Sequence, residues 1–328
     1  MYTRRRFLHT VGATASAASL GAASAVYAQS APDLSRIIVG FPAGGSNDSI
    51  ARLLARKMQG LYAPTLIVEN KVGAGGRIGV DTVRRAAPDG GMVLQTPGSI
   101  LTLYPHIYRS LGYDALRDLT PVSTVCTLDF ALVAGPGTPA RTLGEFVDWC
   151  KSHPRQAIYG SPATGASPHF VGLMFGQAAG LELLHVGYKG AAPAVQDLIG
   201  GQIPAYVGVL ADVAPHLAGG KLRVLATSGS RRSAATPDVP TFQEAGYKDV
   251  SVQEWYGMLL PAKAPDRVVA SLNQAIHAAL RDPEVLERFS ALTVEAAPAT
   301  PEAFAERIRR ERARWAPVVQ ASGFKMEE

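Results

Sequence analysis

The chain has 328 residues and a formal net charge of +5. Part of that charge comes from Arg4, Arg5 and Arg6, and because residues 1–28 contain no Asp or Glu, the rest of the chain carries +2. A chain so close to charge balance gives no reason to expect nucleic acid or an anionic membrane surface as a partner. Its length is sufficient for two domains of ordinary size.

The first 28 residues have the composition of an export signal. Three adjacent arginines precede a run rich in Ala, Gly and Ser that extends to Tyr27. The arginines indicate the twin-arginine route, and small residues favour cleavage after Ala28. Because the run contains little Leu or Ile, we do not expect it to remain as a membrane span.

The segment 41–48 joins a short apolar strand to an amphipathic helix. Ser46 is the predicted N-cap of this helix, and Asp48 falls in its first turn. Backbone N–H groups would then be exposed at the positive end of a helix dipole, where a carboxylate or phosphate can bind. The alternative is that Gly44 and Gly45 only form a tight turn between the strand and the helix.

Strands and helices alternate through the rest of this region. The alternation indicates βαβ units and a parallel sheet, in which ligands bind beyond the carboxyl ends of the strands. The segment 41–48, a glycine-rich loop at 73–76 and residues 96–99 all fall at that edge. The predicted strands are residues 36–40, 64–68 and 92–96.

A long apolar run at 122–134, interrupted near Leu128 and Asp129, is expected to carry the chain into a second lobe. The apolar run at 250–260 is the expected return crossing.

A second α/β series begins after a capping box at Thr142 and Glu145. It repeats the opening motif, with a strand at 157–160, a loop rich in hydroxyl groups and glycine, and a helix for which Ser167 is the predicted N-cap. Two such loops, each in its own series, indicate two lobes that close on a ligand. Further predicted strands are residues 183–188, 203–209 and 222–228.

The C-terminal region is helical. Helical patterns cover 266–281 and 283–291, and a last helix is predicted to begin with Thr300 as N-cap and Pro301 at its first position. Its apolar stripe is assigned to the core: Phe304, Ile308, Trp315 and Val319.

The two cysteines leave two alternatives open. In an oxidising compartment, Cys126 and Cys150 can form one disulfide. Alternatively, each is a small buried core residue, since both lie in apolar runs. No CxxC pair or His/Cys cluster in the sequence indicates a metal site.

The glycine-rich segments occur in an order typical of one protein family. Segment 41–48 is similar to a Phe-Pro-Pro-Gly-Gly-x-x-Asp opening, and segment 68–76 to Val-Glu-Asn-Arg-Pro-Gly-Ala-Gly-Gly. Both motifs resemble those of the Bug-type substrate-binding proteins, the extracytoplasmic receptors of tripartite tricarboxylate transporters. The resemblance extends over the whole chain after residue 28, through residues 87–90, 159–169, 185–190, 219–223, 237–241 and 255–257.

The resemblance implies an α/β fold of two lobes, the periplasmic binding protein or Venus-flytrap architecture, with mostly parallel sheets and two strand crossovers. Lobe 1 would contain residues 29–132 and 255–328, and lobe 2 residues 133–254. The implied protein is a monomeric periplasmic receptor. It captures a small organic carboxylate and delivers it to integral-membrane transporter subunits, without a cofactor or a metal.

In that family, backbone amides, hydroxyls and ordered water from the first loops of the two lobes hold the ligand carboxylate. Each side chain transferred from the family also has a structural alternative: Asp48 can complement its helix dipole, His169 can pack in the first turn of its helix, and Lys189 can be a solvated loop charge. The lobe 1 candidates are Phe41, Ala43, Gly44, Gly45, Ser46, Asn47, Asp48, Thr96 and Ser99. The lobe 2 candidates are Ser161, Thr164, Gly165, Ser167, His169, Tyr188 and Lys189.

The sequence departs from the family pattern at two places. Ala43 replaces the usual second proline, which loosens the turn without removing an N–H donor. Gly208 and Val209 stand where the family often has an Asp-Asn pair that reaches toward the cleft. We therefore expect no polar contact deep in lobe 2, and a ligand with a less polar distal end, such as an aromatic or aliphatic acid.

Two other classes of protein remain as alternatives. An exported enzyme is disfavoured because the chain has no Gly-x-Ser-x-Gly elbow, and because residues 73–79 imitate a dinucleotide fingerprint with the wrong spacing. A ligand-sensing protein that docks on a signalling partner fits the sequence equally well. We expect a non-catalytic binding protein whose mechanism is closure around its ligand.

Overall fold

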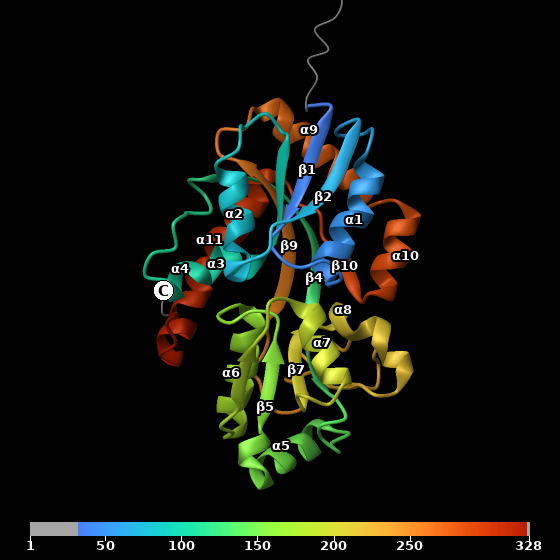
Figure 1. Cartoon of the computed structure of the whole chain (residues 1–328), viewed down its shortest axis with the longest axis vertical. Helices are drawn as coiled ribbons and strands as arrows, with labels where there is room; N and C mark the ends of the chain where they lie inside the picture. The colour runs from blue at the N-terminus through green and yellow to red at the C-terminus, as the bar shows by residue number, and fades with distance from the viewer. Residues whose placement is uncertain (1–31, 327–328) are drawn as a thin grey trace, which may run out of the picture. The chain divides into compact units, whose positions relative to one another are not determined.

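The computed structural model describes residues 32–326, in which strands and helices alternate along most of the chain (Figure 1). This alternation confirms the mixed α/β class. The predicted signal at 1–28 and its cleavage after Ala28 lie outside the described residues. Within 32–326, no helix combines the length and the apolar composition that a membrane span requires.

The described strands form one curled sheet in the order β2-β1-β3-β9-β4-β7-β5-β6, and β8 and β10 also pair with β4. Strand β1 is parallel to β2 and β3, and β5 is parallel to β6 and β7. Strands β4 and β9 are antiparallel to their neighbours and join these two parallel sets. The strands are β1 (Leu34–Val39), β2 (Thr65–Asn70), β3 (Met92–Pro97), β4 (Leu119–Ala134), β5 (Ile158–Ser161), β6 (Leu184–Gly187), β7 (Ala205–Val209), β8 (Arg223–Thr227), β9 (Gln253–Pro261) and β10 (Val294–Ala296).

Strand β4 connects the two parallel sets without a break (Figure 1). The predicted interruption near Leu128 and Asp129 is therefore wrong. The physical reason is an exchange of partners: Asp129 still pairs with Gln253 of β9, and the next residue, Phe130, pairs with Val209 of β7. Since the hydrogen-bond ladder continues on a new neighbour, the backbone stays extended.

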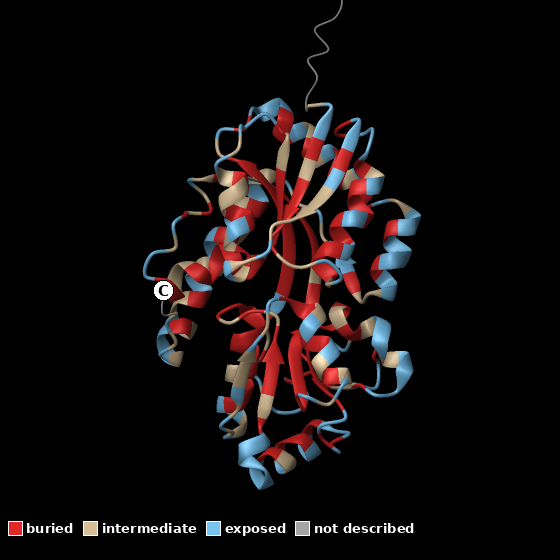
Figure 2. Ribbon diagram, in the orientation of Figure 1, coloured by how far each residue is buried: buried red, intermediate tan, exposed pale blue. Residues whose placement is uncertain are grey.

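Helices cover the sheet and are buried on the sides that face it (Figure 2). Beyond the predicted helices, the structure has two short ones directly after β3. The helices are α1 (Ser46–Met58), α2 (Arg77–Arg84), α3 (Gly98–Thr102), α4 (Tyr104–Ile107), α5 (Leu143–Ser152), α6 (Ser167–Ala179), α7 (Ala191–Ile199), α8 (Leu210–Val213), α9 (Asp266–Ala279), α10 (Pro283–Ala291) and α11 (Pro301–Ser322). Short 3-10 turns are Ala74–Gly76, Pro154–Gln156 and Ala214–Gly219.

The predicted N-caps have different outcomes. Thr300 caps α11 as predicted, because its hydroxyl accepts a hydrogen bond from the N–H of Ala303 (3.2 Å). Ser46 and Ser167 are not N-caps: each is the first helical residue, and no side chain caps α1 or α6. The hydroxyl of Ser46 instead lies 2.8 Å from that of Tyr256, so tertiary contact overrides the local cap preference.

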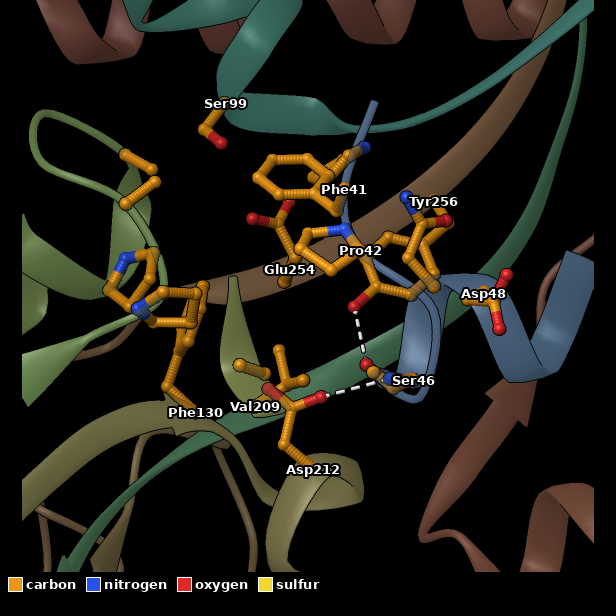
Figure 3. Close-up of a pocket in the computed structure, with 18 residues that line it drawn as sticks. Phe41, Pro42, Ser46, Asp48, Ser99, Phe130, Val209, Asp212, Glu254 and Tyr256 are labelled. Carbon is orange, nitrogen blue, oxygen red and sulfur yellow. Dashed lines mark hydrogen bonds between the residues drawn. The ribbon is translucent and has the colours of Figure 1, made fainter. Parts of the chain in front are cut away.

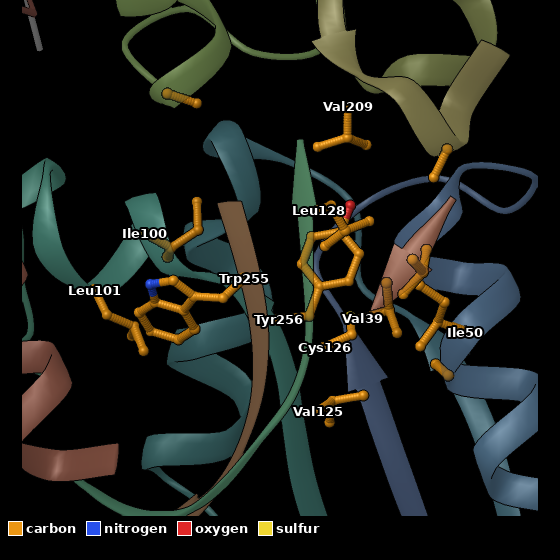
Figure 4. Packing of buried hydrophobic residues seen from close by; sticks show 14 of the residues in the cluster. Val39, Ile50, Ile100, Leu101, Val125, Cys126, Leu128, Val209, Trp255 and Tyr256 are labelled. Atoms are coloured by element: carbon orange, nitrogen blue, oxygen red, sulfur yellow. The ribbon is translucent and has the colours of Figure 1, made fainter. Parts of the chain in front are cut away.

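The core runs along the sheet and includes large side chains from β9 and α11. Trp255 packs edge-on against Phe304 with 5.2 Å between ring centroids, and both rings are fully buried. Figure 4 shows Trp255 and Cys126 among the packed apolar side chains. Cys126 and Cys150 are both buried free thiols, which confirms the core interpretation rather than the disulfide.

Candidate functional site

The loop between β1 and α1 is held by close backbone approach and by an acidic side chain. A side chain at Gly40 would collide with the backbone of Gly76, because a Cβ there would lie 2.8 Å from the Cα of Gly76. The carboxylate of Asp48 accepts hydrogen bonds from the N–H of Gly44 (3.2 Å), from Arg52 (3.0 Å) and from Asn70 (2.9 Å). Asp48 therefore fixes the loop, in addition to lying at the helix N-terminus.

The N-terminus of α1 also contacts a carboxylate from the other parallel set. Asp212 in α8 accepts a hydrogen bond on one oxygen from the backbone N–H of Ser46 (3.1 Å; Figure 3). Its other oxygen accepts from the hydroxyl of Tyr206 (2.9 Å). Two of the amides that we expected to bind an external anion, those of Gly44 and Ser46, are thus bonded to carboxylates of the protein itself.

A cavity of about 60 Å³ lies beside this contact. Such a volume holds roughly four to six water molecules or a small organic group. The β1–α1 loop contributes Phe41, Pro42, Gly45, Ser46, Asn47 and Asp48. Strand β3, α3, β4 and β9 contribute Pro97, Ser99, Phe130, Glu254 and Tyr256. The opposite wall contains Pro162, Ala163, Ala166, Pro168, Ala191, Val209 and Asp212.

The walls of the cavity touch each other around its rim. A Cβ added to Gly45 would lie 3.7 Å from the Cβ of Ala191, at ordinary van der Waals distance. A Cβ on Gly190 would lie 2.7 Å from a ring carbon of Pro42. The structure therefore corresponds to a closed arrangement of the two loops, which explains the small volume.

The ionisable lining of the cavity is acidic. Its carboxyl groups are those of Asp48, Asp212 and Glu254, and among the described residues no Lys, Arg or His lines it. Burial raises the pKa of Glu254 to about 8, although one of its oxygens accepts hydrogen bonds from the N–H groups of Gly98 and Trp255.

The other two acids differ from Glu254. Burial raises the pKa of Asp212 as well, against hydrogen bonds from Ser46 and Tyr206 that lower it. For Asp48, burial also acts to raise the pKa, but the hydrogen bonds from Arg52, Asn70 and Gly44 outweigh it and hold the pKa below its usual value. Asp48 is therefore the acid whose charge is compensated.

Asn47 has an unpaired donor at this site. Its side-chain oxygen accepts a hydrogen bond from Gln95 (2.7 Å), whereas its buried Nδ2 has no hydrogen-bond partner. Asn47 is 6% exposed and lines the cavity. A buried donor without an acceptor is costly, so a bound acceptor would stabilise it.

The structure brings only part of the predicted lobe 1 set to the cavity. Ala43 and Gly44 are exposed at the loop, and Thr96 is buried at the end of β3 outside the lining. The predicted residues that line the cavity are Phe41, Gly45, Ser46, Asn47, Asp48 and Ser99.

None of the seven predicted lobe 2 residues lines the cavity. Residues adjacent to them in the sequence do line it: Pro162, Ala163, Ala166 and Pro168. The ring of His169 stacks on His185 with 3.8 Å between centroids and accepts a hydrogen bond from the N–H of Gly165. Burial lowers the pKa of His169 to about 4.

The remaining lobe 2 candidates bond to other protein groups, line a neighbouring cavity or lie nearer the surface. The hydroxyl of Ser161 lies 2.8 Å from His185, and that of Tyr188 donates to Asp197 (2.8 Å). Ser167 lines a neighbouring cavity of about 170 Å³ that shares Ser99 and Glu254 with the first. Thr164 is half-buried and Lys189 is exposed, as its structural alternative requires. Their roles in ligand binding stay predictions.

Sequence reasoning predicted Asp48 but missed the other two acids that line the cavity, Asp212 and Glu254. Val209 presents an apolar side chain there, as expected, but this wall is not wholly apolar, because Asp212 lines the cavity three residues later. The absence of a polar ligand contact deep in lobe 2 stays a prediction. The sequence signal of Asp212 was its position just beyond the carboxyl end of β7, the sheet edge where ligands bind. Glu254 and Tyr256 gave no comparable signal, since they lie inside the apolar run at 250–260, whose pattern indicates only the return crossing.

Comparisons with known proteins identify the family. The model of the tripartite tricarboxylate transporter family receptor matches residues 50–324. BugT of Bordetella pertussis (strain Tohama I) is 34% identical over 293 residues, which cover 89% of this chain and 90% of BugT. The structure of the periplasmic binding protein BugD has a TM-score of 0.85 and 33% identity, and covers 90% of this chain and 99% of its own.

A structure of Rpa4515 from R. palustris with adipate also has a TM-score of 0.85, with 27% identity over 89% of this chain and 98% of its own. The family model describes a transporter receptor and BugD is a periplasmic binding protein, and the TM-scores show that this chain shares the fold of BugD and of Rpa4515. The chain belongs to the tripartite tricarboxylate transporter receptor family, with Bug-type binding proteins among its relatives.

Proposed function

We propose that this protein is a periplasmic receptor that captures a small organic carboxylate and delivers it to the membrane subunits of a tripartite tricarboxylate-type transporter. Its export would depend on the predicted twin-arginine signal at 1–28. The observation that carries the proposal is the cavity between the β1–α1 loop and the β5–α6 loop. The adipate complex of Rpa4515 supports a carboxylate as the bound group.

The donors at the cavity fit one carboxylate. The buried Nδ2 of Asn47 lacks an acceptor, and the hydroxyl of Ser99 points toward the cavity (Figure 3). On the opposite wall, Ala166 and Pro168 lie at the N-terminus of α6, which no side chain caps. The positive end of this 13-residue helix favours an anion.

Closure is the proposed mechanism. We assign lobe 1 to residues 29–132 and 255–328 and lobe 2 to residues 133–254, so that β4 crosses between them beside the cavity. In the open state the two loops separate and admit the ligand; in the closed state they bury it. The membrane subunits would recognise the closed form of a monomeric receptor.

A thermal-shift screen tests the proposal, with mono-, di- and tricarboxylates, aromatic acids and amino acids as probes. A ligand present at a hundred times its dissociation constant stabilises the protein by about 2.7 kcal/mol. We expect at least one carboxylate to raise the melting temperature by several degrees, and its uncharged amide analogue to have a clearly smaller effect. A silent panel, with no ligand released on denaturation for mass spectrometry, would contradict the proposal.

A further inference from the structure

The charge of the cavity lining does not match the charge of a polycarboxylate. Among the described residues that line the cavity, the acidic groups are three carboxyls and the phenol of Tyr256, and no Lys, Arg or His lies among them. Arg52 compensates the charge of Asp48, and the raised pKa of Glu254 keeps that group mostly protonated near pH 7. The negative charge that would repel a ligand with two or three carboxylates is therefore that of Asp212. The lining therefore disfavours tricarboxylates, the ligands named in the family description.

Asp212 is an acid at the cavity that lacks a cationic partner among the described residues. Ser46 and Tyr206 each donate a hydrogen bond to it, and the N–H of Ser46 belongs to the N-terminus of α1, whose dipole offsets part of the charge. Neither donor is cationic. In the described part of the chain no Lys, Arg or His forms an ion pair with Asp212, whereas Arg52 pairs with Asp48. A carboxylate removed from water without a cationic partner is unfavourable, and an ammonium group in contact with it relieves that cost.

The geometry leaves Asp212 available to a ligand. Its side chain is half-buried and lines the cavity, and each of its oxygens has one donor in the protein. A carboxylate oxygen accepts a second hydrogen bond readily. Glu254, on the facing strand β9, is a further acceptor at the cavity and is itself without an ion pair in the described part of the chain.

We propose that the ligand is a small zwitterion, with a cationic nitrogen bound by Asp212 and a carboxylate bound by Asn47 and the N-terminus of α6. This inference rests on the proposed function and narrows its ligand class. The unpaired Nδ2 of Asn47 is the independent observation for the anionic end, because it is a buried donor at the same cavity. The apolar surfaces of Phe41, Phe130 and Val209 then contact the carbon chain between the two charges.

Isothermal titration of the purified protein with matched ligands tests the inference. Within each set the carboxylate end is constant and the distal end is an ammonium, a methyl or a second carboxylate, as in 4-aminobutyrate, pentanoate and glutarate. Shorter and longer homologues of each set cover the range of chain length. We expect the ammonium member of the best set to bind at least tenfold more tightly than its methyl and carboxylate analogues.

The outcomes separate the two claims. Tighter binding of the methyl or the dicarboxylate member would overturn the inference and leave the receptor function standing. Failure of every carboxylate, in these sets and in the wider screen, would overturn the receptor function as well.

A pair of variants tests the residue. Asp212→Asn keeps the oxygen that accepts from Ser46 and removes the negative charge, so the preference for the ammonium member should fall at least tenfold. Asp197→Asn is the matched control: Asp197 also accepts a hydrogen bond from a tyrosine hydroxyl, that of Tyr188, but lies outside the cavity lining. A preference that survives in Asp212→Asn, or is lost equally in Asp197→Asn, would contradict the assignment. The measurements on the unmodified protein decide the ligand class even if a variant fails to fold.

Discussion

Glu254 offers a direct test of the electrostatics of the cavity. Its carboxyl is buried, and its pKa is raised from 4.5 to about 8. The unfolded chain therefore releases this proton at a lower pH than the folded protein does. The stabilisation is fully present below about pH 4.5 and is lost as the pH rises through about 8.

The magnitude follows from the two pKa values. Stability changes by ~1.4 kcal/mol for each pH unit between them. Between about pH 5 and pH 8, Glu254 should therefore lower the free energy of unfolding by ~3.5 kcal/mol. For a chain of this length that corresponds to roughly 7 °C in the melting temperature.

The perturbation is Glu254→Gln, which retains the oxygen that accepts from Gly98 and Trp255 and cannot ionise. The melting temperatures of the variant and the unmodified protein should lie close together near pH 5 and separate in favour of the variant by roughly 7 °C near pH 8. His169 and His185, whose pKa values burial lowers to about 4 and about 3, act equally in both proteins and cancel in the difference.

The control is Glu306→Gln on the exposed surface of α11, whose side chain is 62% exposed and paired with Arg309. Exposed pairs contribute about 1 kcal/mol or less, so the control should follow the unmodified protein at every pH. A gap between Glu254→Gln and the unmodified protein that stays constant from about pH 5 to pH 8 would refute the reasoning.

Other predictions concern the crossing between the strand sets, the C-terminal helix and the thiols. Ser228 accepts from the N–H of Phe130 where β4 changes partners, so Ser228→Ala should lower stability by about 1–3 kcal/mol in urea unfolding; an unchanged midpoint would count against this role. Thr300→Ala removes the cap of α11 and should cost about 1 kcal/mol, measured in the same way; a loss below a few tenths would show that the cap is redundant. Burial raises the pKa of Cys126, and that of Cys150 to about 11, so neither thiol should react with Ellman's reagent before unfolding, and rapid labelling of the native protein would disagree.

Most of the fold could be predicted because its signals are local. The buried runs of β1 and β3 and the stripe of α11 follow from the spacing of apolar residues, and Thr300 caps its helix as its position suggests. The partner exchange in β4 could not be predicted, because Asp129 and Phe130 carry no mark of which strand lies beside them. Pairing between distant strands depends on the whole sheet.

In the candidate site, too, the residues with a local sequence signal were predicted and those that depend on distant contacts were not. The β1–α1 loop was predicted because glycine, serine and aspartate at a helix N-terminus have a local meaning. Asp212 was missed because its role depends on contact with Ser46, 166 positions away in the chain. A second distant contact, between the hydroxyl groups of Ser46 and Tyr256, explains why Ser46 is not an N-cap.

Carboxylate capture is the central claim, and one calorimetric titration tests it most directly. The purified protein is titrated with the best carboxylate from the screen and, separately, with the primary amide of the same compound. The account predicts one carboxylate bound per chain and a loss of at least tenfold in affinity for the amide, because the N-terminus of α6 favours an anion and a hydrogen bond from the Nδ2 of Asn47 is stronger to a charged acceptor than to a neutral one. Equal affinity for the acid and its amide would contradict it.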